Sequence, residues 1–207
     1  MTAPHDGLPP PEPVLRPLAQ TPGLLCWPAL LGTAGAQALM QQLHSEIPWA
    51  QPEITLFGRT GPVPRLQSWH GEPEARYAYS GLPLPPTPWT PGLRRILDAV
   101  ETATGHRFNS VLANLYRNGH DTMGWHADDE AELGPAPWIA SYSLGATRDF
   151  TLRRRGTTRI AERIALEHDQ LLLMPPEMQR HWEHALPRRA RVLTPRINLT
   201  FRFIYHD

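Results

Sequence analysis

The second half of the chain consists of short apolar or alternating runs separated by turn residues, and this pattern restricts the possible folds more than any other feature. The runs lie at residues 110–116, 139–144, 149–154, 160–166, 170–174 and 196–204. Short runs with period-two alternation are typical of antiparallel strands in a sandwich or barrel. Two earlier runs, at 53–57 and 76–79, raise the expected number of strands to about eight, enough for a double-sheet jelly roll.

Two amphipathic helices are expected in the first half of the chain. In the first, apolar residues recur at helical spacing behind Thr33, a candidate cap, and the pattern stops before Pro48. The second has Thr90 as its cap, Pro91 at the first helical position and Gly105 past its end. The expected fold class is mainly β with flanking helices (α+β), with a double-stranded β-helix, or jelly roll, as its core.

The domain organisation follows from composition and length. Residues 1–22 contain seven prolines and little apolar periodicity, so we expect an extended or disordered lead-in outside the core. Residues 23–207 are long enough to form a single domain. The lone cysteine, Cys26, excludes an internal disulfide and indicates a reducing compartment. No stretch approaches the roughly 20 apolar residues that span a bilayer, and no secretory signal is visible, so we expect a cytoplasmic protein without membrane contact.

A candidate metal site combines two distant motifs. The segment GWHADDE places His126 and Asp128 two residues apart, where side chains of an extended segment point the same way. The segment HWEHALP offers His181 and His184 as a third ligand. Two histidines and one carboxylate form the facial triad of non-haem iron(II). Zinc hydrolases use similar ligands, and an isolated His-x-Asp is more often a surface histidine beside a solvated acid, so the triad alone leaves the metal open.

The last run, PRINLTFRFI, has a polar face. That face carries Arg196, Asn198, Thr200 and Arg202. Such alternation fits a half-buried strand with its polar side in water. It also fits a site for a buried dicarboxylate, because guanidinium groups supply bidentate donors that stay charged. The earlier run SVLANLYRNG places Asn114 and Tyr116 on one face, where an amide and a phenol complete the hydrogen bonds of such an anion.

Taken in order, the motifs resemble those of the AlkB family of nucleic-acid demethylases, in particular the branch that includes the vertebrate duplex-DNA repair enzyme. The resemblance runs from about Gln51 to Ile204. Its motifs are LFGR (56–59), VPR (63–65), YSGLPLPPTPW (79–89), NLYRNGHDTMGWHADDE (114–130), IASYSLGATRDF (139–150), HWEHALP (181–187) and PRINLTFR (195–202). The resemblance implies a nucleotide-recognition lid over 51–110 and a jelly-roll catalytic core over 111–207.

The resemblance also implies an activity and its cofactors. It implies a dioxygenase that uses Fe(II), 2-oxoglutarate and O2 to demethylate bases of the 1-methyladenine and 3-methylcytosine type in DNA, releasing formaldehyde, succinate and CO2. By the same matching, His126, Asp128 and His184 hold the iron, and Arg196 binds the distal carboxylate of 2-oxoglutarate with help from Tyr116. The other polar residues on these faces are expected around its metal-chelating end or in support of it: Asn114, Asn198, Thr200 and Arg202.

Further residues match positions where the family contacts the damaged base. Asp129 and Glu130 are candidates because bases methylated on a ring nitrogen are cationic and a nearby carboxylate favours them; the alternative is a pair of solvated loop acids. Tyr77 and Trp69 are candidate pocket walls, although aromatic residues at these positions fit a core equally well.

Contacts with the duplex are expected from one apolar residue and several arginines. Phe57 matches the apolar finger that fills the gap left by a flipped base, and its alternative is a buried anchor of the run 53–57. The arginines that are candidates for phosphate contacts are Arg59, Arg65, Arg153, Arg154 and Arg155. A solvated hairpin explains the last three equally well.

The expected partner is alkylated DNA, single- or double-stranded, bound by a monomer. One alternative keeps the chemistry but acts on RNA, a free nucleotide or a protein side chain. Another is a metal-binding jelly roll without turnover that recognises damaged DNA. The pair Arg196 and Arg202 argues against this last alternative, because a mere binder has no use for a dicarboxylate site.

Overall fold

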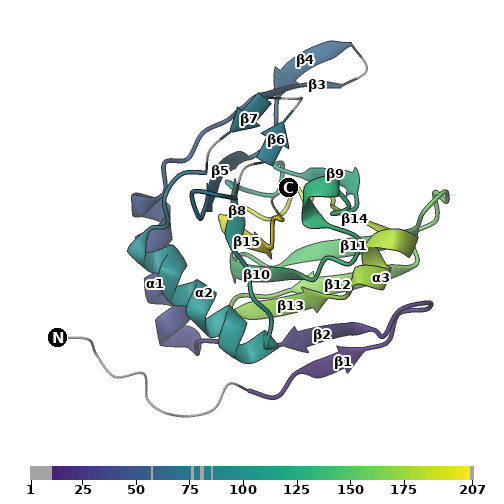
Figure 1. Cartoon of the computed structure of the whole chain (residues 1–207), viewed down its shortest axis with the longest axis horizontal. Coiled ribbons are helices and arrows are strands. Elements are labelled where there is room, and N and C mark those ends of the chain that lie inside the picture. The colour runs from purple at the N-terminus through teal and green to yellow at the C-terminus, as the bar shows by residue number, and fades with distance from the viewer. Residues whose placement is uncertain (1–10, 57, 76, 80–81, 85, 206–207) are drawn as a thin grey trace.

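Two antiparallel sheets face each other and enclose the centre of the molecule (Figure 1). The computed structural model describes residues 11–56, 58–75, 77–79, 82–84 and 86–205. The larger sheet has seven strands, in the spatial order β1 (Val14–Arg16), β2 (Leu24–Trp27), β13 (Gln170–Met174), β10 (Ile139–Gly145), β15 (Arg196–Arg202), β8 (Ser110–Tyr116) and β5 (Leu66–Gly71). The smaller sheet has four, in the order β12 (Glu162–Leu166), β11 (Arg148–Arg154), β14 (Trp182–Leu186) and β9 (Met123–His126). This is the jelly-roll core that the sequence predicts.

Helices and two hairpins surround these sheets. The helices are α1 (Thr33–Glu46), α2 (Pro91–Thr104), the short α3 (Pro176–His181) and a 3-10 turn (Ala131–Leu133). The hairpins are β3 (Glu53–Leu56) with β4 (Arg59–Pro62), and β6 (Tyr77–Tyr79) with β7 (Leu82–Leu84). Both hairpins lie at the top of Figure 1, on one side of the two sheets. Among the described residues, no helix is long and apolar enough to cross a membrane.

The main apolar core lies between α1, α2 and the outer face of the larger sheet. Leu43 of α1 and Ile96 of α2 pack in one cluster with Ile197, Leu199 and Phe201 of β15, all fully buried. Each such side chain contributes roughly 1.5–3 kcal/mol on burial. Because side chains alternate along a strand, the intervening polar residues of β15 point into the space between the sheets. The alternation therefore separates a core face from a site face.

The predicted cap and ends of α2 are confirmed, whereas the predicted cap of α1 is wrong. The Thr90 hydroxyl accepts a hydrogen bond from Leu93 N (3.2 Å), Pro91 begins α2, and Gly105 ends it in the left-handed conformation (φ 72°). Helix α1 does begin at Thr33, but its N-cap is Gly32, with φ 74° and no side-chain cap. Thr33 is a helical residue and not the predicted cap.

The strand count is larger than predicted, since 15 strands are present in the described part of the chain. The eight predicted strands all form, with ends shifted by no more than two residues. The strands that the alternation did not indicate are β1, β2, β4, β5, β7, β9 and β14. Several of them are too short to show a period, while β9 and β14 each carry a histidine of the site where the alternation would need an apolar residue.

The predicted domain boundaries need two corrections. The lead-in was expected to stay outside the core up to residue 22, but Val14–Arg16 pairs with β2. Leu18 is also buried, in a second apolar cluster that contains Phe150 and Leu152 of β11. Residues 1–10 of the lead-in lie outside those described. The expected lid, 51–110, is not one unit either: β5 pairs with β8 in the larger sheet and α2 covers that sheet. Among the described residues of this range, only the two hairpins form sheets of their own.

Candidate active site

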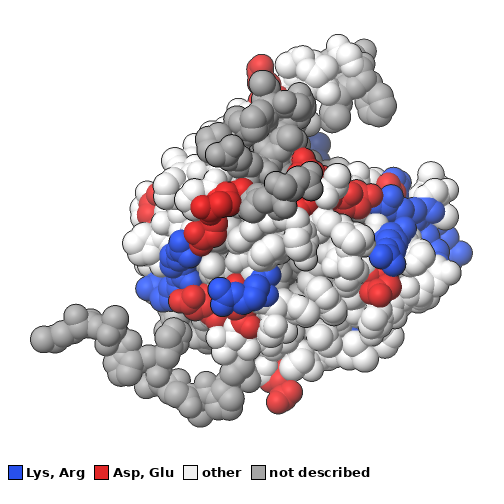
Figure 2. Space-filling model, in the orientation of Figure 1, with Lys and Arg blue, Asp and Glu red and all other residues white. Residues whose placement is uncertain are grey.

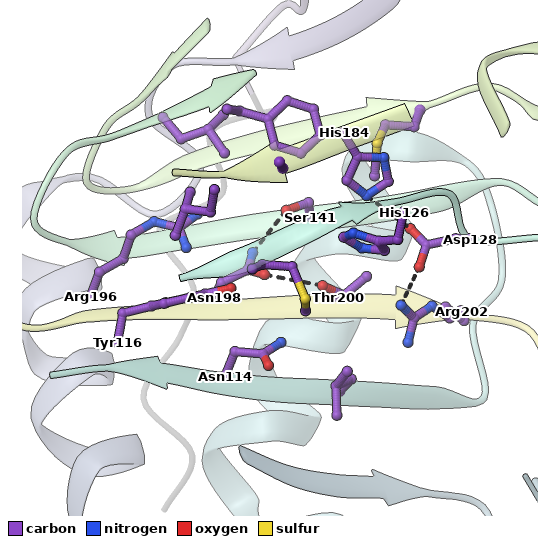
Figure 3. A pocket seen from close by; sticks show the side chains of 17 residues that line it. Asn114, Tyr116, His126, Asp128, Ser141, His184, Arg196, Asn198, Thr200 and Arg202 are labelled. Carbon is purple, nitrogen blue, oxygen red and sulfur yellow. Dashed lines mark hydrogen bonds and ion pairs between the residues drawn. The ribbon is translucent and has the colours of Figure 1, made fainter. Parts of the chain in front are cut away.

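The site is a pocket between the inner faces of the two sheets (Figure 3). His126 on β9 and His184 on β14 are direct partners in the ladder between these strands, and their ring centroids are 4.2 Å apart. Asp128 follows two residues after His126. One ligand atom from each of the three residues lies within 4.8 Å of the others, and Asp128 Oδ2 is 3.6 Å from His184 Nε2. The fold thus brings together the three predicted metal ligands.

The alternative third ligand, His181, lies apart from this cluster. It is the last residue of α3 and is exposed, whereas His184 is 4% exposed. Of the two histidines that the sequence offered, only His184 shares a site with His126 and Asp128 in the described part of the chain.

The protonation states of these residues suit a divalent cation. His126 Nδ1 donates to the Gly124 carbonyl (2.9 Å), which directs Nε2 away from the backbone. Burial, together with the neighbouring His126, lowers the pKa of His184 to about 3, so its imidazole is neutral. Burial alone raises the pKa of the Asp128 carboxyl, but the charge and hydrogen bond of the Arg202 guanidinium outweigh that effect and hold this pKa below its usual value. The donors are therefore two imidazoles, of which that of His184 is neutral, and one carboxylate.

Asp128 is held from two sides. The Arg202 guanidinium donates to Asp128 Oδ1, and Asp128 N donates to Gln179 Oε1 (3.0 Å). Asp128 Oδ2 is buried and has no hydrogen-bond partner among the described residues. A buried carboxylate oxygen without a partner is costly, and coordination to a metal ion removes that cost. The residues present therefore fit a metal centre.

The far end of the pocket is built by Arg196 and Tyr116, which are ladder partners on β15 and β8. The Arg196 guanidinium lies 5.4 Å from the centroid of the Tyr116 ring and donates to Ser143 Oγ (2.9 Å). Its Nε is buried without a partner among the described residues. Burial lowers the pKa of Arg196 to about 10 and raises that of Tyr116, so at neutral pH the first is a cation and the second a phenol donor. This end suits a carboxylate.

The polar residues between the two ends form a connected network. Asn198 Nδ2 donates to Ser141 Oγ (2.8 Å), and the Thr200 hydroxyl donates to Asn198 Oδ1 (3.1 Å). Figure 3 shows these three residues between Arg196 and Arg202. Two further polar residues of this network, Ser141 and Ser143, were not predicted from the sequence. Their positions two apart in the predicted strand IASYSLG, facing the polar side of β15, would have indicated them.

Arg65 has a partner inside the protein. It was predicted to contact phosphate, but its Nε donates to Asn114 Oδ1 (2.8 Å) and one terminal nitrogen donates to Gln67 Oε1 (3.2 Å). Asn114 lines the pocket. Arg65 therefore orients a residue of the candidate cosubstrate site, and its contact with phosphate stays a prediction.

The predicted arginine cluster lies at the end of β11, where basic side chains gather at the right of Figure 2. Arg153 donates to Glu183 (2.7 Å) and lies 4.4 Å from the Trp125 ring centroid. Arg155 pairs with Asp129, one of the two candidate base contacts.

The neighbouring Arg154 lies 5.0 Å from the Trp182 ring centroid and donates to Gln20. All three arginines of this hairpin thus have partners within the chain. Phosphate contacts by them stay predictions.

Three predicted contacts fall on parts of the lid that the structure leaves undescribed. Phe57 lies outside the described residues. For Arg59 and Tyr77 only the backbone, in β4 and β6, is described. The other candidate pocket wall, Trp69 on β5, packs partly buried against the second apolar cluster.

Comparison with known proteins decides the family. The model of the 2OG-Fe(II) oxygenase superfamily matches residues 23–202. The mouse protein named DNA oxidative demethylase ALKBH2 is 44% identical over 193 residues, which cover 88% of this chain and 81% of that protein. The chain belongs to the AlkB family of this superfamily. Another family member, the human alpha-ketoglutarate-dependent dioxygenase alkB homolog 3, is 40% identical over 190 residues, covering 87% and 66% of the two chains.

Solved structures of low sequence identity agree with the fold. The structure titled OsALKBH1 superposes with a TM-score of 0.66 at 18% identity, over 92% of this chain and all of that one. A 2OG-Fe(II) oxygenase from Burkholderia pseudomallei gives 0.58 at 15% identity, over 89% and 86%. The present chain, as a member of this family, is a 2-oxoglutarate- and iron-dependent dioxygenase. Its cofactors are Fe(II), 2-oxoglutarate and O2. The predicted family, fold class and cofactors are confirmed.

Proposed function

We propose that this dioxygenase oxidatively demethylates alkylated bases in DNA, of the 1-methyladenine and 3-methylcytosine type, and releases formaldehyde, succinate and CO2. Relatives that share 44% of their aligned residues with it are named DNA oxidative demethylases. The observation that carries the proposal is one pocket with His126, Asp128 and His184 at one end and the Arg196–Tyr116 pair at the other. A pocket with these two ends suits a metal ion beside a dicarboxylate.

Different residues along the pocket hold the metal and bind the cosubstrate. His126, Asp128 and His184 would hold the iron, which together with 2-oxoglutarate supplies the oxidising chemistry for hydroxylation of an N-methyl group. Arg196 and Tyr116 bind the distal carboxylate of 2-oxoglutarate through charge-assisted hydrogen bonds. The remaining donors around the cosubstrate are Asn114, Asn198, Thr200 and Arg202. Because these groups are buried, bulk water is excluded from the reacting centre.

Selection of the damaged base rests on charge. A base methylated on a ring nitrogen carries a positive charge, so a carboxylate beside it favours the lesion over the unmodified base. Glu130 is partly buried, whereas Asp129 is exposed and paired with Arg155. Glu130 is therefore the stronger candidate for contact with the base.

The partner is DNA in single- or double-stranded form, and Phe57 is the candidate for filling the gap in a duplex. Arg59 remains a candidate phosphate contact. Action on RNA is the alternative with the same chemistry, and a monomeric state stays a prediction.

The test uses the iron-loaded protein with 2-oxoglutarate, O2 and ascorbate on oligonucleotides that carry 1-methyladenine or 3-methylcytosine. Each lesion is offered in single-stranded DNA, duplex DNA and RNA. Mass spectrometry is expected to show loss of one methyl group from DNA with an equal amount of succinate. Turnover of RNA alone, or succinate without any loss of methyl from nucleic acid, would contradict the proposed substrate.

A further inference from the structure

A second buried arginine lies behind the cosubstrate end of the pocket. Arg148, the first residue of β11, is 1% exposed, and its guanidinium lies 5.8 Å from the centroid of the Tyr116 ring. Arg196 lies over the same ring at 5.4 Å. Arg196 lines the pocket but Arg148 does not. The ring that is placed to receive the distal carboxylate is thus in contact with two cations, one from each sheet.

The hydrogen bonds of Arg148 join three segments. Its terminal nitrogens donate to the carbonyls of Asn118 (3.2 Å), Asp121 (2.9 Å) and Pro187 (2.7 Å). These carbonyls belong to the loops that follow β8 and β14. The guanidinium therefore ties both loops to β11 and fixes the wall behind Tyr116.

The two loops are already in tight backbone contact. Gly119 N donates to the Val192 carbonyl (2.7 Å), and Arg189 N donates to the Gly119 carbonyl (2.8 Å). A Cβ on Gly119 would lie 1.7 Å from the Arg189 carbonyl oxygen, so only glycine fits there. This packing leaves the wall little freedom to move once Arg148 is in place.

Neither buried guanidinium has an acidic partner in the described part of the chain. No ion pair joins Arg148 or Arg196 to a carboxylate there. The acids near Arg148 are engaged elsewhere, Asp121 with Arg117 (2.8 Å) and Asp149 with Arg189. Two buried cations without an anion are costly. A bound carboxylate offsets that cost.

We propose that Arg148 is a positioning residue for the cosubstrate, which holds the Tyr116 ring in place and adds a second positive charge where the distal carboxylate binds. Arg148 thereby helps to select a 2-oxo acid that carries a carboxylate at that end. This inference rests on the proposed cosubstrate site. It assigns a role to a residue that does not touch the ligand.

The test removes the distal carboxylate from the ligand and the guanidinium from the protein. Binding of 2-oxoglutarate and of 2-oxopentanoate, which has a methyl group in place of the distal carboxylate, is measured by anaerobic calorimetry on the Fe(II)-loaded protein. In Arg148→Met, affinity for 2-oxoglutarate is expected to fall about tenfold, equivalent to 1.4 kcal/mol. Affinity for 2-oxopentanoate is expected to stay within about twofold, because that ligand has no charge at this end.

Two further variants separate charge from geometry and from general effects. Arg148→Lys keeps the charge but not the forked donor, so an intermediate loss is expected. Arg163→Met removes an exposed arginine from the neighbouring strand β12 and should leave both affinities unchanged. In turnover, Arg148→Met should raise KM for 2-oxoglutarate and leave KM for DNA unchanged.

Four results would overturn the inference. Equal losses for the two acids would show that Arg148 only supports the fold, and no loss for either would show that it has no role. If unaltered protein binds 2-oxoglutarate and Arg196→Met weakens it while Arg148→Met does not, only the role of Arg148 fails. If the unaltered protein does not bind 2-oxoglutarate, the proposed cosubstrate site fails together with it.

Discussion

The two ends of the pocket are both built from buried charged groups, but their charges are balanced in opposite ways. At the metal end, Asp128 lies beside two imidazoles and pairs with Arg202 through Oδ1, while its Oδ2 has no hydrogen-bond partner among the described residues. At the far end, Arg196 and Arg148 have no carboxylate within ion-pair distance in that same part of the chain. The metal end thus offers carboxylate and imidazole ligand atoms to a cation, whereas the far end offers cations to an anion. The protein is thus complementary to a metal ion bound beside a dicarboxylate.

The largest effect is expected from removing a ligand at the metal end. His184→Ala should reduce demethylation by more than the roughly 10–100-fold that is typical for loss of an outer-shell partner. His181→Ala is the matched control, because this exposed histidine lies three residues earlier and outside the cluster. Activity assays on both variants check this. Substantial turnover by His184→Ala, or equal losses in both variants, would contradict the assignment of the metal end.

The second-largest effect is expected from removing the guanidinium of Arg196 at the far end of the pocket. Arg196→Met should weaken 2-oxoglutarate binding by about 2–5 kcal/mol, the usual cost of truncating one partner of a buried charge pair. That corresponds to a rise of roughly thirtyfold or more in KM for 2-oxoglutarate. Steady-state kinetics with varied 2-oxoglutarate measure it, and kcat at saturation should recover in part. If KM for DNA rises instead, the far end serves the substrate and not the cosubstrate.

A smaller effect is expected in the stability of the metal-free protein. The unfolded chain protonates His184 below the ordinary pKa of 6.5, whereas the folded chain does so only below about 3. Protonation therefore favours the unfolded state between these values, and the free energy of unfolding should fall by about 1 kcal/mol from pH 7 to pH 5.5 on account of this residue. Urea denaturation with a chelator present measures it.

The control for this pH effect is His184→Gln, which cannot titrate. Its free energy of unfolding should depend less steeply on pH than that of the unaltered protein over the same interval. Equal slopes would show that the His184 imidazole is not buried in its neutral form.

The smallest effect is expected outside both ends, at the exposed pair Arg155–Asp129. The two side chains are 40% and 51% exposed, so Arg155→Ala should change the free energy of unfolding by less than about 1 kcal/mol. Its effect on activity should depend on salt if Arg155 also meets phosphate. Denaturation and assays at two salt concentrations test this. A large loss of stability would mean that the pair belongs to the structure of the site.

The sequence predicts what local signals specify. Thr90, Pro91 and Gly105 delimit α2 through contacts within a few residues, and the alternation in PRINLTFRFI separates the core face of β15 from its site face. The resemblance of motifs adds the roles of His126 and Arg196, which lie far apart in the chain.

The features of the fold and the site that were not predicted depend on contacts between distant segments of the chain. Gln179 supports Asp128 from 51 residues away, and Arg148 reaches carbonyls 27 to 39 residues away, so no local pattern marks either residue. Strand β14 was missed because His184 serves the site and interrupts the apolar alternation of its buried face. The Arg65 bond to Asn114 crosses from β5 to β8 and becomes visible only once these strands are paired.

The central claim is that a metal ion and a dicarboxylate bind side by side in one pocket. Anaerobic calorimetry of 2-oxoglutarate binding, with Fe(II) present and with Fe(II) removed by a chelator, tests it most directly. We predict one 2-oxoglutarate per chain, bound tightly with Fe(II) and far more weakly without it, with this dependence lost in His184→Ala. Equally tight binding with and without the metal would contradict the account, because the two ligands would then occupy separate sites.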